Sequence, residues 1–240
     1  DIYEIKKETN LIKRKEKLEF NIIKFNDMNF KYLNGNYIFK DINLEIKRGE
    51  KIGIVGKTGS GKTTLVNLLI GLLTPSKGKI YIDDKNIFEN LSNWQKNIGY
   101  VSQETFLADE TLLFNIVLQA LDEPTDKERC KYLIRLMDLE KLIESKNEGL
   151  DFVVGEKGIK LSGGQIQRIG IARALYKKPE ILILDEATNA LDVDTQNKII
   201  QNVYREMREK TIISISHDIH ALEYCDKIFS INKNQFINFK

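Results

Sequence analysis

The stretch KIGIVGKTGSGKTTLVNLLIGLL, residues 51–73, constrains the fold of this chain more than any other. Its first part is a compact apolar run that ends in Gly56, as expected of a buried strand that leads into a turn and a helix. Between Gly56 and Thr63 the spacing is G-x-x-x-x-G-K-[ST], and a helical pattern follows over residues 62–72. Glycines at these positions let backbone N–H groups point at phosphate oxygens, beside the positive end of the helix. The stretch predicts a strand, a phosphate-binding loop and a helix.

The side chains of this loop have separate expected tasks. Lys62 would reach the β- and γ-phosphates of a nucleoside triphosphate, and it counts as catalytic for that reason. Thr63 would offer its hydroxyl group to Mg²⁺. We expect the nucleotide to be held by Gly56, Lys57, Thr58, Gly59, Ser60, Gly61, Lys62, Thr63 and Thr64.

A second apolar run, residues 181–184, ends in two carboxylates, Asp185 and Glu186. Adjacent residues of a strand point in different directions, so the two acids should have separate functions. We assign Asp185 to Mg²⁺ and Glu186 to polarising the attacking water. The alternative for Glu186 is an ordinary carboxylate at the start of a helix.

Buried strand patterns alternate with helical patterns along the chain, which indicates an α/β fold with a parallel sheet. The helices are expected at residues 62–72, 127–139, 164–176 and 195–208. FNIIKF, DMNFKY and INLEIK alternate and suggest an antiparallel N-terminal sheet, and GKIYID, IGYVSQ, EILILD, KTIISIS and KIFSIN are further strand candidates. Residues 104–160 show little strand pattern and are interpreted as a mostly helical insertion.

LSGGQ, residues 161–165, is a second glycine-rich stretch that lacks the lysine and threonine of the first loop. It offers a serine hydroxyl and N–H groups at a helix N-terminus, which is half of a phosphate site. Together with LILDEA and the first loop, it resembles the ATP-binding cassette (ABC) ATPases, whose signature motif is LSGGQ. The resemblance implies a P-loop NTPase fold with the signature on a helical subdomain, at about 104–176. It also implies that ATP is held between two copies of the chain arranged head to tail.

The resemblance extends over about residues 20–239 and implies further site residues. Tyr32 matches the aromatic residue that stacks on adenine, with Tyr37 as the alternative. The stretch 190–192 matches the loop that crosses the dimer interface, but Asn189 stands where the family usually has serine. His220 matches no role. The remaining implied residues are Gln103 at Mg²⁺ and the membrane partner, His217 as the catalytic switch histidine, and Ser162, Gly163, Gly164, Gln165 and Asp192 at the nucleotide of the opposite copy.

VGEKG, residues 154–158, and TFLADETLLFNI, residues 105–116, resemble the exporter branch of the family. Exporters commonly carry a membrane domain ahead of the ATPase. The chain begins with Asp1 rather than Met, so we expect residues 1–19 to be a linker and residues 20–240 to be an ATPase domain on the cytoplasmic face of a membrane. The expected partners are a second copy and the membrane-spanning domain, with a lipid-type cargo slightly favoured. An importer subunit and a cassette protein without a transport role are the alternatives.

Composition excludes several other classes of protein. A net charge of +2 over 240 residues gives no argument for a nucleic acid partner, and we expect none. The longest apolar run, residues 65–73, is far shorter than the roughly 20 residues that span a bilayer, so this piece should be soluble by itself. Cys130 and Cys225 share no motif and are expected to be free thiols.

Overall fold

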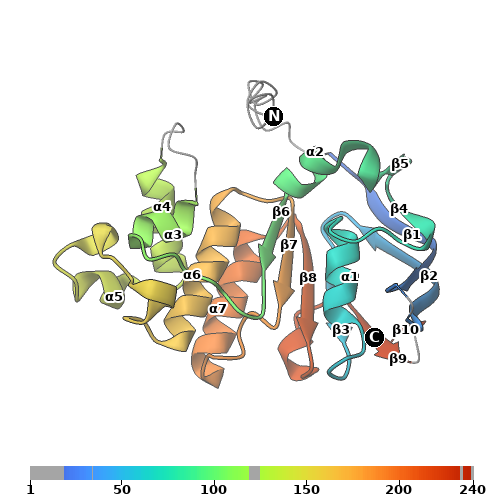
Figure 1. Cartoon of the computed structure of the whole chain (residues 1–240). Coiled ribbons are helices and arrows are strands. Elements are labelled where there is room, and N and C mark those ends of the chain that lie inside the picture. Colours follow the sequence, from blue (N-terminus) through green and yellow to red (C-terminus); the bar gives the residue numbers. More distant parts are fainter. Residues whose placement is uncertain (1–18, 34, 119–124, 233–234, 239–240) are drawn as a thin grey trace.

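The computed structural model of the chain describes residues 19–33, 35–118, 125–232 and 235–238. Two β-sheets and α1 (Lys62–Leu69) form one side of the molecule, and a group of short helices forms the other side (Figure 1). Between them lie α6 (Gly163–Tyr176) and α7 (Val193–Glu206). The expected α/β architecture, with a parallel core and an antiparallel sheet, is confirmed.

The larger sheet has the strand order β10-β9-β3-β8-β7-β6, and all of its pairs are parallel except β10 with β9. Every residue of β7 and β8 is buried, which explains why β7 begins with four apolar residues and why β8 carries only small hydroxyl residues among its isoleucines. The strands are β3 (Lys51–Val55), β6 (Ile98–Val101), β7 (Ile181–Asp185), β8 (Thr211–Ser216), β9 (Lys227–Asn232) and β10 (Gln235–Asn238).

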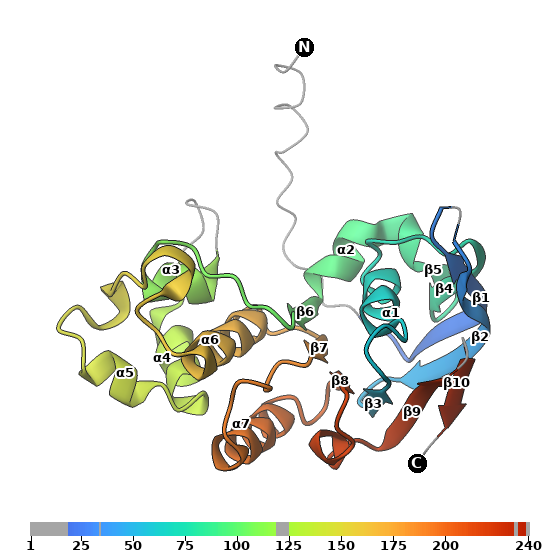
Figure 2. The ribbon, with the colours of Figure 1, turned by 60° about the horizontal axis from the view of Figure 1, so that its bottom comes forward.

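The parallel sheet separates two hydrophobic cores. Ile181 and Ile183 of β7 belong to the core that contains the apolar face of α1. Leu182 and Leu184 belong to the core built with α6 and α7. Alternation along one strand therefore supplies both faces of the sheet. Viewed along the strands, α1 and α7 lie on opposite faces (Figure 2).

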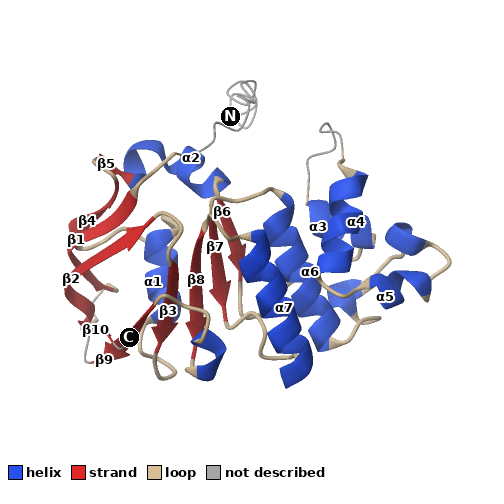
Figure 3. Cartoon of the chain, turned by 180° about the vertical axis from the view of Figure 1, so that it is seen from behind, coloured by secondary structure: helices blue, strands red, loops and turns tan. Residues whose placement is uncertain are grey.

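The smaller sheet is antiparallel, with the order β2-β1-β4-β5 (Figure 3). Two expectations are wrong here. FNIIKF and DMNFKY form one strand rather than two, because a bulge with Asp27 at φ 44° absorbs the polar residues without reversing the chain. GKIYID lies in this sheet and not in the parallel one, since its strand pairs with β1. The strands are β1 (Ile22–Lys31), β2 (Tyr37–Lys47), β4 (Lys77–Ile82) and β5 (Lys85–Asn86).

The segment between β6 and β7 is mostly helical, as expected, with one isolated bridge between Thr111 and Val153. It contains α3 (Leu112–Val117), α4 (Lys127–Leu136), α5 (Glu140–Glu144) and the 3₁₀ helices η3 (Gly149–Asp151) and η4 (Glu156–Gly158), followed by α6. The domain boundaries drawn from the sequence stay predictions, and residues 1–18 of the expected linker lie outside the described residues. The remaining short helices are α2 (Leu91–Lys96), η2 (Ile87–Asn90) and η5 (His220–Leu222).

Helix ends differ from the expected ones for local reasons. α1 stops at Leu69, because Gly71 at φ 78° ends the helix. α4 stops at Leu136, before Asp138 at φ 53°. α7 starts two residues early because Asp192 caps it, accepting a hydrogen bond from the Thr195 N–H at 3.0 Å. In the part of the chain that the structure describes, we find no helix with the length and apolar character needed to cross a membrane.

Candidate functional site

A hollow of about 490 Å³ lies where β3, β7 and β8 of the parallel sheet end. The carboxyl ends of parallel strands are the usual place for ligand sites in open α/β sheets. Ten of the residues that line the hollow were predicted as site residues, and two were not. The lining consists of Ile38, Thr58, Gly59, Gly61, Lys62, Thr63, Thr64, Gln103, Asp185, Glu186, Asn189 and His217.

The phosphate-binding loop wraps around the side chain of Lys62, which is 8% exposed. The Lys62 ammonium group donates hydrogen bonds to the carbonyl oxygens of Gly56 at 2.9 Å and Lys57 at 3.2 Å. Gly61 has φ 104°, and a Cβ atom there would lie 2.7 Å from the Ile38 side chain, so no other residue fits without displacement. The buried Ser60 hydroxyl has no hydrogen-bond partner within the described residues. The loop thus carries a buried cation and an unsatisfied hydroxyl group.

Asp185 is the last residue of β7, and it is 3% exposed. Burial raises the pKa of its carboxyl group, and the neighbouring Glu186 carboxylate raises it further. The Tyr100 hydroxyl, which donates at 3.4 Å, and the charge of Lys62 oppose this shift. Burial next to Asp185 also raises the pKa of Tyr100 to about 12. A desolvated carboxylate of this kind would be stabilised by a cation in the hollow.

Glu186 follows the strand in a left-handed conformation, with φ 50°, and its N–H donates to the Ile215 carbonyl oxygen at 3.0 Å. This turn, rather than strand alternation, separates the two acidic side chains. Three groups surround the Glu186 carboxylate. Asn189 Nδ2 donates to Oε2 at 2.9 Å, His217 Nδ1 lies 3.6 Å from Oε2, and Lys62 Nζ lies 3.7 Å from Oε1.

Oxygen atoms suited to Mg²⁺ converge on the same hollow. Thr63 offers a hydroxyl group, Gln103 an amide oxygen and Asp185 a carboxylate. Mg²⁺ takes one or two protein carboxylates together with phosphates and water, so this set fits the ion. Among the described residues there is no group of three or more His, Cys, Asp or Glu that could hold a metal. The expected magnesium site therefore depends on Asp185 as its carboxylate.

The two candidate adenine-stacking residues have different surroundings. The Tyr32 hydroxyl lies 3.2 Å from Thr64 Oγ1 at the start of α1, and its ring packs edge-on against Phe30. The Tyr37 ring lies against two ammonium groups, from Lys31 at 5.4 Å and Lys40 at 5.3 Å. Tyr32 is therefore the residue in contact with the loop region.

The signature stretch begins α6, and none of the described residues 162–165 lines the hollow. Ser162 and Gln165 form a capping box: the Gln165 N–H donates to the Ser162 hydroxyl, and the Ser162 N–H donates to the Gln165 side chain. Asp192 is exposed at the start of α7, also outside the hollow. The hydrogen bonds from Thr195 lower the pKa of the Asp192 carboxyl group. Within one chain, the two predicted half-sites are not brought together.

Sequence reasoning missed three residues of the site. Tyr100 and Asn189 bond to the two carboxylates, and Ile38 packs against Gly61. Ile38 and Tyr100 stand in ordinary strand patterns, and nothing in those patterns distinguishes them as site residues. Asn189 was visible as a departure from the family pattern, but its contact with Glu186 depends on the turn after β7.

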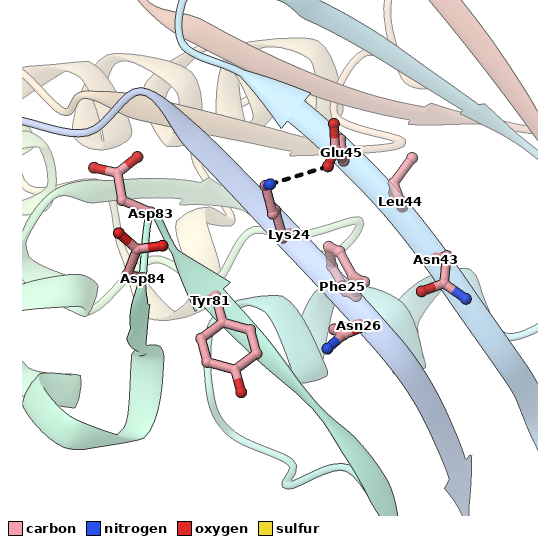
Figure 4. A pocket seen from close by; sticks show the side chains of 9 residues that line it. All are labelled: Lys24, Phe25, Asn26, Asn43, Leu44, Glu45, Tyr81, Asp83 and Asp84. Atoms are coloured by element: carbon pink, nitrogen blue, oxygen red, sulfur yellow. Dashed lines mark ion pairs between the residues drawn. The ribbon is translucent and has the colours of Figure 1, made fainter.

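A second hollow, of about 550 Å³, lies on the antiparallel sheet (Figure 4). Lys24 points toward Glu45 of the neighbouring strand and pairs with it at 3.2 Å. Both side chains of this pair are about half exposed, so the pair is solvated. None of the predicted site residues lines this hollow, and we assign it no function.

A family model described as ABC transporter matches residues 39–189, which is more than half of the chain. The chain belongs to the ABC transporter family. ATP-binding domains of this family are ATPases, and the expected class of enzyme is therefore confirmed. The P-loop NTPase fold of this ABC domain is confirmed by the solved structure described next.

Relatives of this ABC domain include the leukotoxin translocation ATP-binding protein LktB of Mannheimia glucosida, 40% identical over 218 residues. The LktB protein of Mannheimia haemolytica is 39% identical over 217 residues. Both matches cover 90% of this chain but only 30% of the relative. The structure of a bacterial Atm1-family ABC exporter with ATP bound superposes with a TM-score of 0.85 at 30% identity, over 91% of this chain and 38% of the other. The expected membership of the exporter-type ABC domains is confirmed.

Proposed function

We propose that this chain is the ATP-hydrolysing domain of an exporter and that its active sites form between two copies. The observation that carries the proposal is the position of Glu186, whose carboxylate faces the hollow with Lys62 and His217 within 3.7 Å. Phosphoryl transfer to water needs positive charge at the phosphates and a group that orients or deprotonates the water, and Lys62 and Glu186 supply these at one end of the phosphate-binding loop.

The residues of the hollow divide the work of binding. Backbone N–H groups of residues 56–64 and the Lys62 ammonium group would hold the phosphates. Thr63, Gln103 and Asp185 would hold Mg²⁺, which when bound supplies positive charge to the phosphate oxygens. The raised pKa of Asp185 supports this assignment, because a buried carboxylate that Tyr100 and Lys62 compensate only in part is stabilised further by a cation.

The reaction assigned to Glu186 is general-base catalysis. Glu186 would accept a proton from water as the water oxygen bonds to the γ-phosphorus, and the bond from that phosphorus to the β–γ bridging oxygen breaks. The products are ADP, inorganic phosphate and the proton. His217, which is well exposed and lies beside Glu186, would contact the γ-phosphate.

The signature stretch would complete the site of a second copy. Ser162 caps α6, which begins with Gly163, Gly164 and Gln165 outside the hollow of its own chain. The capping box uses the N–H groups of Ser162 and Gln165, so the glycine N–H groups and the Ser162 hydroxyl would contact the partner's nucleotide. Asp192, which precedes α7, is exposed as well and would face the partner with them. A head-to-tail pair with two-fold symmetry places each signature stretch against the partner's phosphate-binding loop.

We expect the chain to dimerise only with ATP, because the nucleotide bridges the two half-sites. Mass action then makes the dimer depend on both ATP and protein concentration. Light scattering over a range of protein concentrations, with and without ATP, measures this. Turnover per molecule should rise over the range where dimers form. A stable dimer that is indifferent to ATP would contradict the composite site.

Ser162→Asp provides a matched variant for this experiment. Aspartate caps helices as well as serine does, so α6 should be retained. Its charge would repel the partner's γ-phosphate, so the variant should bind ATP but fail to dimerise. Dimerisation of this variant at parent concentrations would show that Ser162 does not face the partner's nucleotide.

Tyr32→Ala is expected to weaken ATP binding by about 1–3 kcal/mol, the value of one stacked base. GTP binding should fall equally, because stacking tolerates different bases. Tyr32→Phe keeps the ring and removes only the hydroxyl near Thr64, so its affinity should stay close to the parent value. Calorimetric titration measures the ATP and GTP affinities of Tyr32→Ala and the ATP affinity of Tyr32→Phe. A larger loss for Tyr37→Ala than for Tyr32→Ala would assign the adenine to Tyr37 instead.

We further propose that residues 20–240 form the ATPase domain, with a helical subdomain at about 104–176, and that residues 1–19 link it to a membrane-spanning domain. The chain spans 30% of the length of its LktB relatives, so those proteins contain more than this domain. In this arrangement the chain lies at the cytoplasmic face of the membrane. The relatives are named for translocating a leukotoxin, which favours a toxin-type cargo over the lipid-type cargo expected from family frequency.

A further inference from the structure

Asn189 makes the closest polar contact of the Glu186 carboxylate. Its Nδ2 atom donates to Oε2 at 2.9 Å, whereas His217 Nδ1 and Lys62 Nζ lie 3.6 and 3.7 Å from the carboxylate oxygens. We propose that Asn189 is a positioning residue that holds the Glu186 carboxylate in the orientation needed to accept the proton of water. The inference rests on the proposed function of Glu186.

The geometry explains why a positioning group is needed. The terminal torsion of a glutamate side chain has a broad, two-fold energy profile, so the carboxylate rotates readily unless a directional bond holds it. An ammonium group at 3.7 Å attracts without selecting an orientation, whereas an amide N–H at 2.9 Å selects one oxygen. With Oε2 held by Asn189, Oε1 remains on the side of Lys62.

Asn189 is itself held by the backbone around it. Its N–H group donates to the Glu186 carbonyl oxygen at 3.4 Å, and the next N–H, of Ala190, donates to Gln167 Oε1 at 2.9 Å. Gln167 lies on α6 and is 8% exposed. The loop that carries Asn189 is therefore fixed to a buried residue of the signature helix. This attachment keeps the Asn189 amide in place beside Glu186.

The expected effect is on the rate of chemistry and not on ATP affinity. Asn189→Leu removes the N–H donor at similar size, and we expect kcat to fall by about 10-fold with KM changed by less than about 3-fold, as for a lost hydrogen bond to a charged group. Asn189→Asp also lacks the donor and adds a charge beside Glu186, so it should be slower than Asn189→Leu. Asn189→Ser restores a shorter donor and should recover part of the rate.

The measurement is ATP turnover at saturating ATP and at protein concentrations where the rate per molecule no longer rises, which removes effects on dimerisation. Asn197→Leu makes the same exchange at an exposed position of α7 and controls for the added apolar surface. Parent-like turnover of Asn189→Leu would overturn the inference, and so would an equal rate for Asn189→Ser and Asn189→Leu.

A double variant separates positioning from an independent role. With Glu186→Gln there is no base to orient, so adding Asn189→Leu should leave the single-turnover rate unchanged and the ATP-bound dimer intact on gel filtration. A further loss of about 10-fold, or loss of the dimer, would show that Asn189 acts elsewhere. Parent-like turnover of Glu186→Gln alone would instead overturn the proposed function.

Discussion

Lys62→Ala is expected to weaken the binding of Mg-ATP by roughly two to four orders of magnitude. Lys62 is the buried cation of the phosphate-binding loop, and its removal deletes charge-assisted hydrogen bonds worth about 1.5–3 kcal/mol each to two phosphates. The carbonyl oxygens of Gly56 and Lys57, which Lys62 satisfies, would then face the phosphates without a donor. Calorimetric titration with Mg-ATP measures the loss, and unchanged affinity would refute the assignment of the loop.

Lys51 provides a matched control for this variant. Its ammonium group is also buried, and it donates to the carbonyl oxygens of Gly49, Arg208 and Lys210 at the opposite end of β3. Lys51→Ala should lower the melting temperature, because these carbonyl groups lose their donor, but the folded protein should bind Mg-ATP as the parent does. A similar loss of affinity in both variants would indicate general destabilisation rather than a specific role of Lys62.

Much of the fold could be predicted because its strongest sequence patterns are local. A strand buried on both faces is rich in apolar residues without alternation, so β3, β7 and β8 were visible without tertiary information. The loop from Gly56 to Thr63 could be placed because its spacing is set by backbone geometry around phosphates. Six of the loop residues line the hollow, and the other four predicted residues that line it, Gln103, Asp185, Glu186 and His217, lie at or just after the ends of the neighbouring strands.

The errors arise where a long-range contact decides the outcome. GKIYID alternates as any half-buried strand does, and only its pairing with β1 places it in the antiparallel sheet. Asn26 and Asp27 have the composition of a turn, but β1 continues through them because β2 and β4 pair with both ends of the strand. Local composition contains no information about which partner strand is available.

The contacts of Glu186 could not be predicted for a related reason. They depend on a left-handed residue directly after β7, a conformation that is uncommon for glutamate. This turn brings Asn189, three residues later, back onto the carboxylate. Backbone strain of this kind concentrates at functional sites, which is consistent with a position selected for chemistry rather than for stability.

Glu186→Gln is expected to lower ATP turnover by about 10²–10⁴-fold, the value of a positioned general base, or roughly 3–5 kcal/mol of barrier. Glutamine keeps the size of the side chain but lacks the basic oxygen and the charge. ATP binding should therefore persist, and the ATP-bound dimer should be more stable, because repulsion between the carboxylate and the γ-phosphate is removed. Gel filtration with ATP, beside a steady-state assay of phosphate release, measures both effects.

The control for this variant is Glu180→Gln, the same exchange at the residue before β7. Glu180 is 5% exposed, and its carboxylate pairs with Arg48 at 3.4 Å and Lys210 at 3.5 Å, at the end of the strand opposite Glu186. Its loss should cost some stability, because Arg48 and Lys210 lose their ion-pair partner. It should not trap a dimer, because Glu180 does not line the hollow. If Glu186→Gln hydrolysed ATP at a rate near that of the parent, another group would have to activate the water. His217, which lies beside Glu186 in the hollow, would then be the first residue to test.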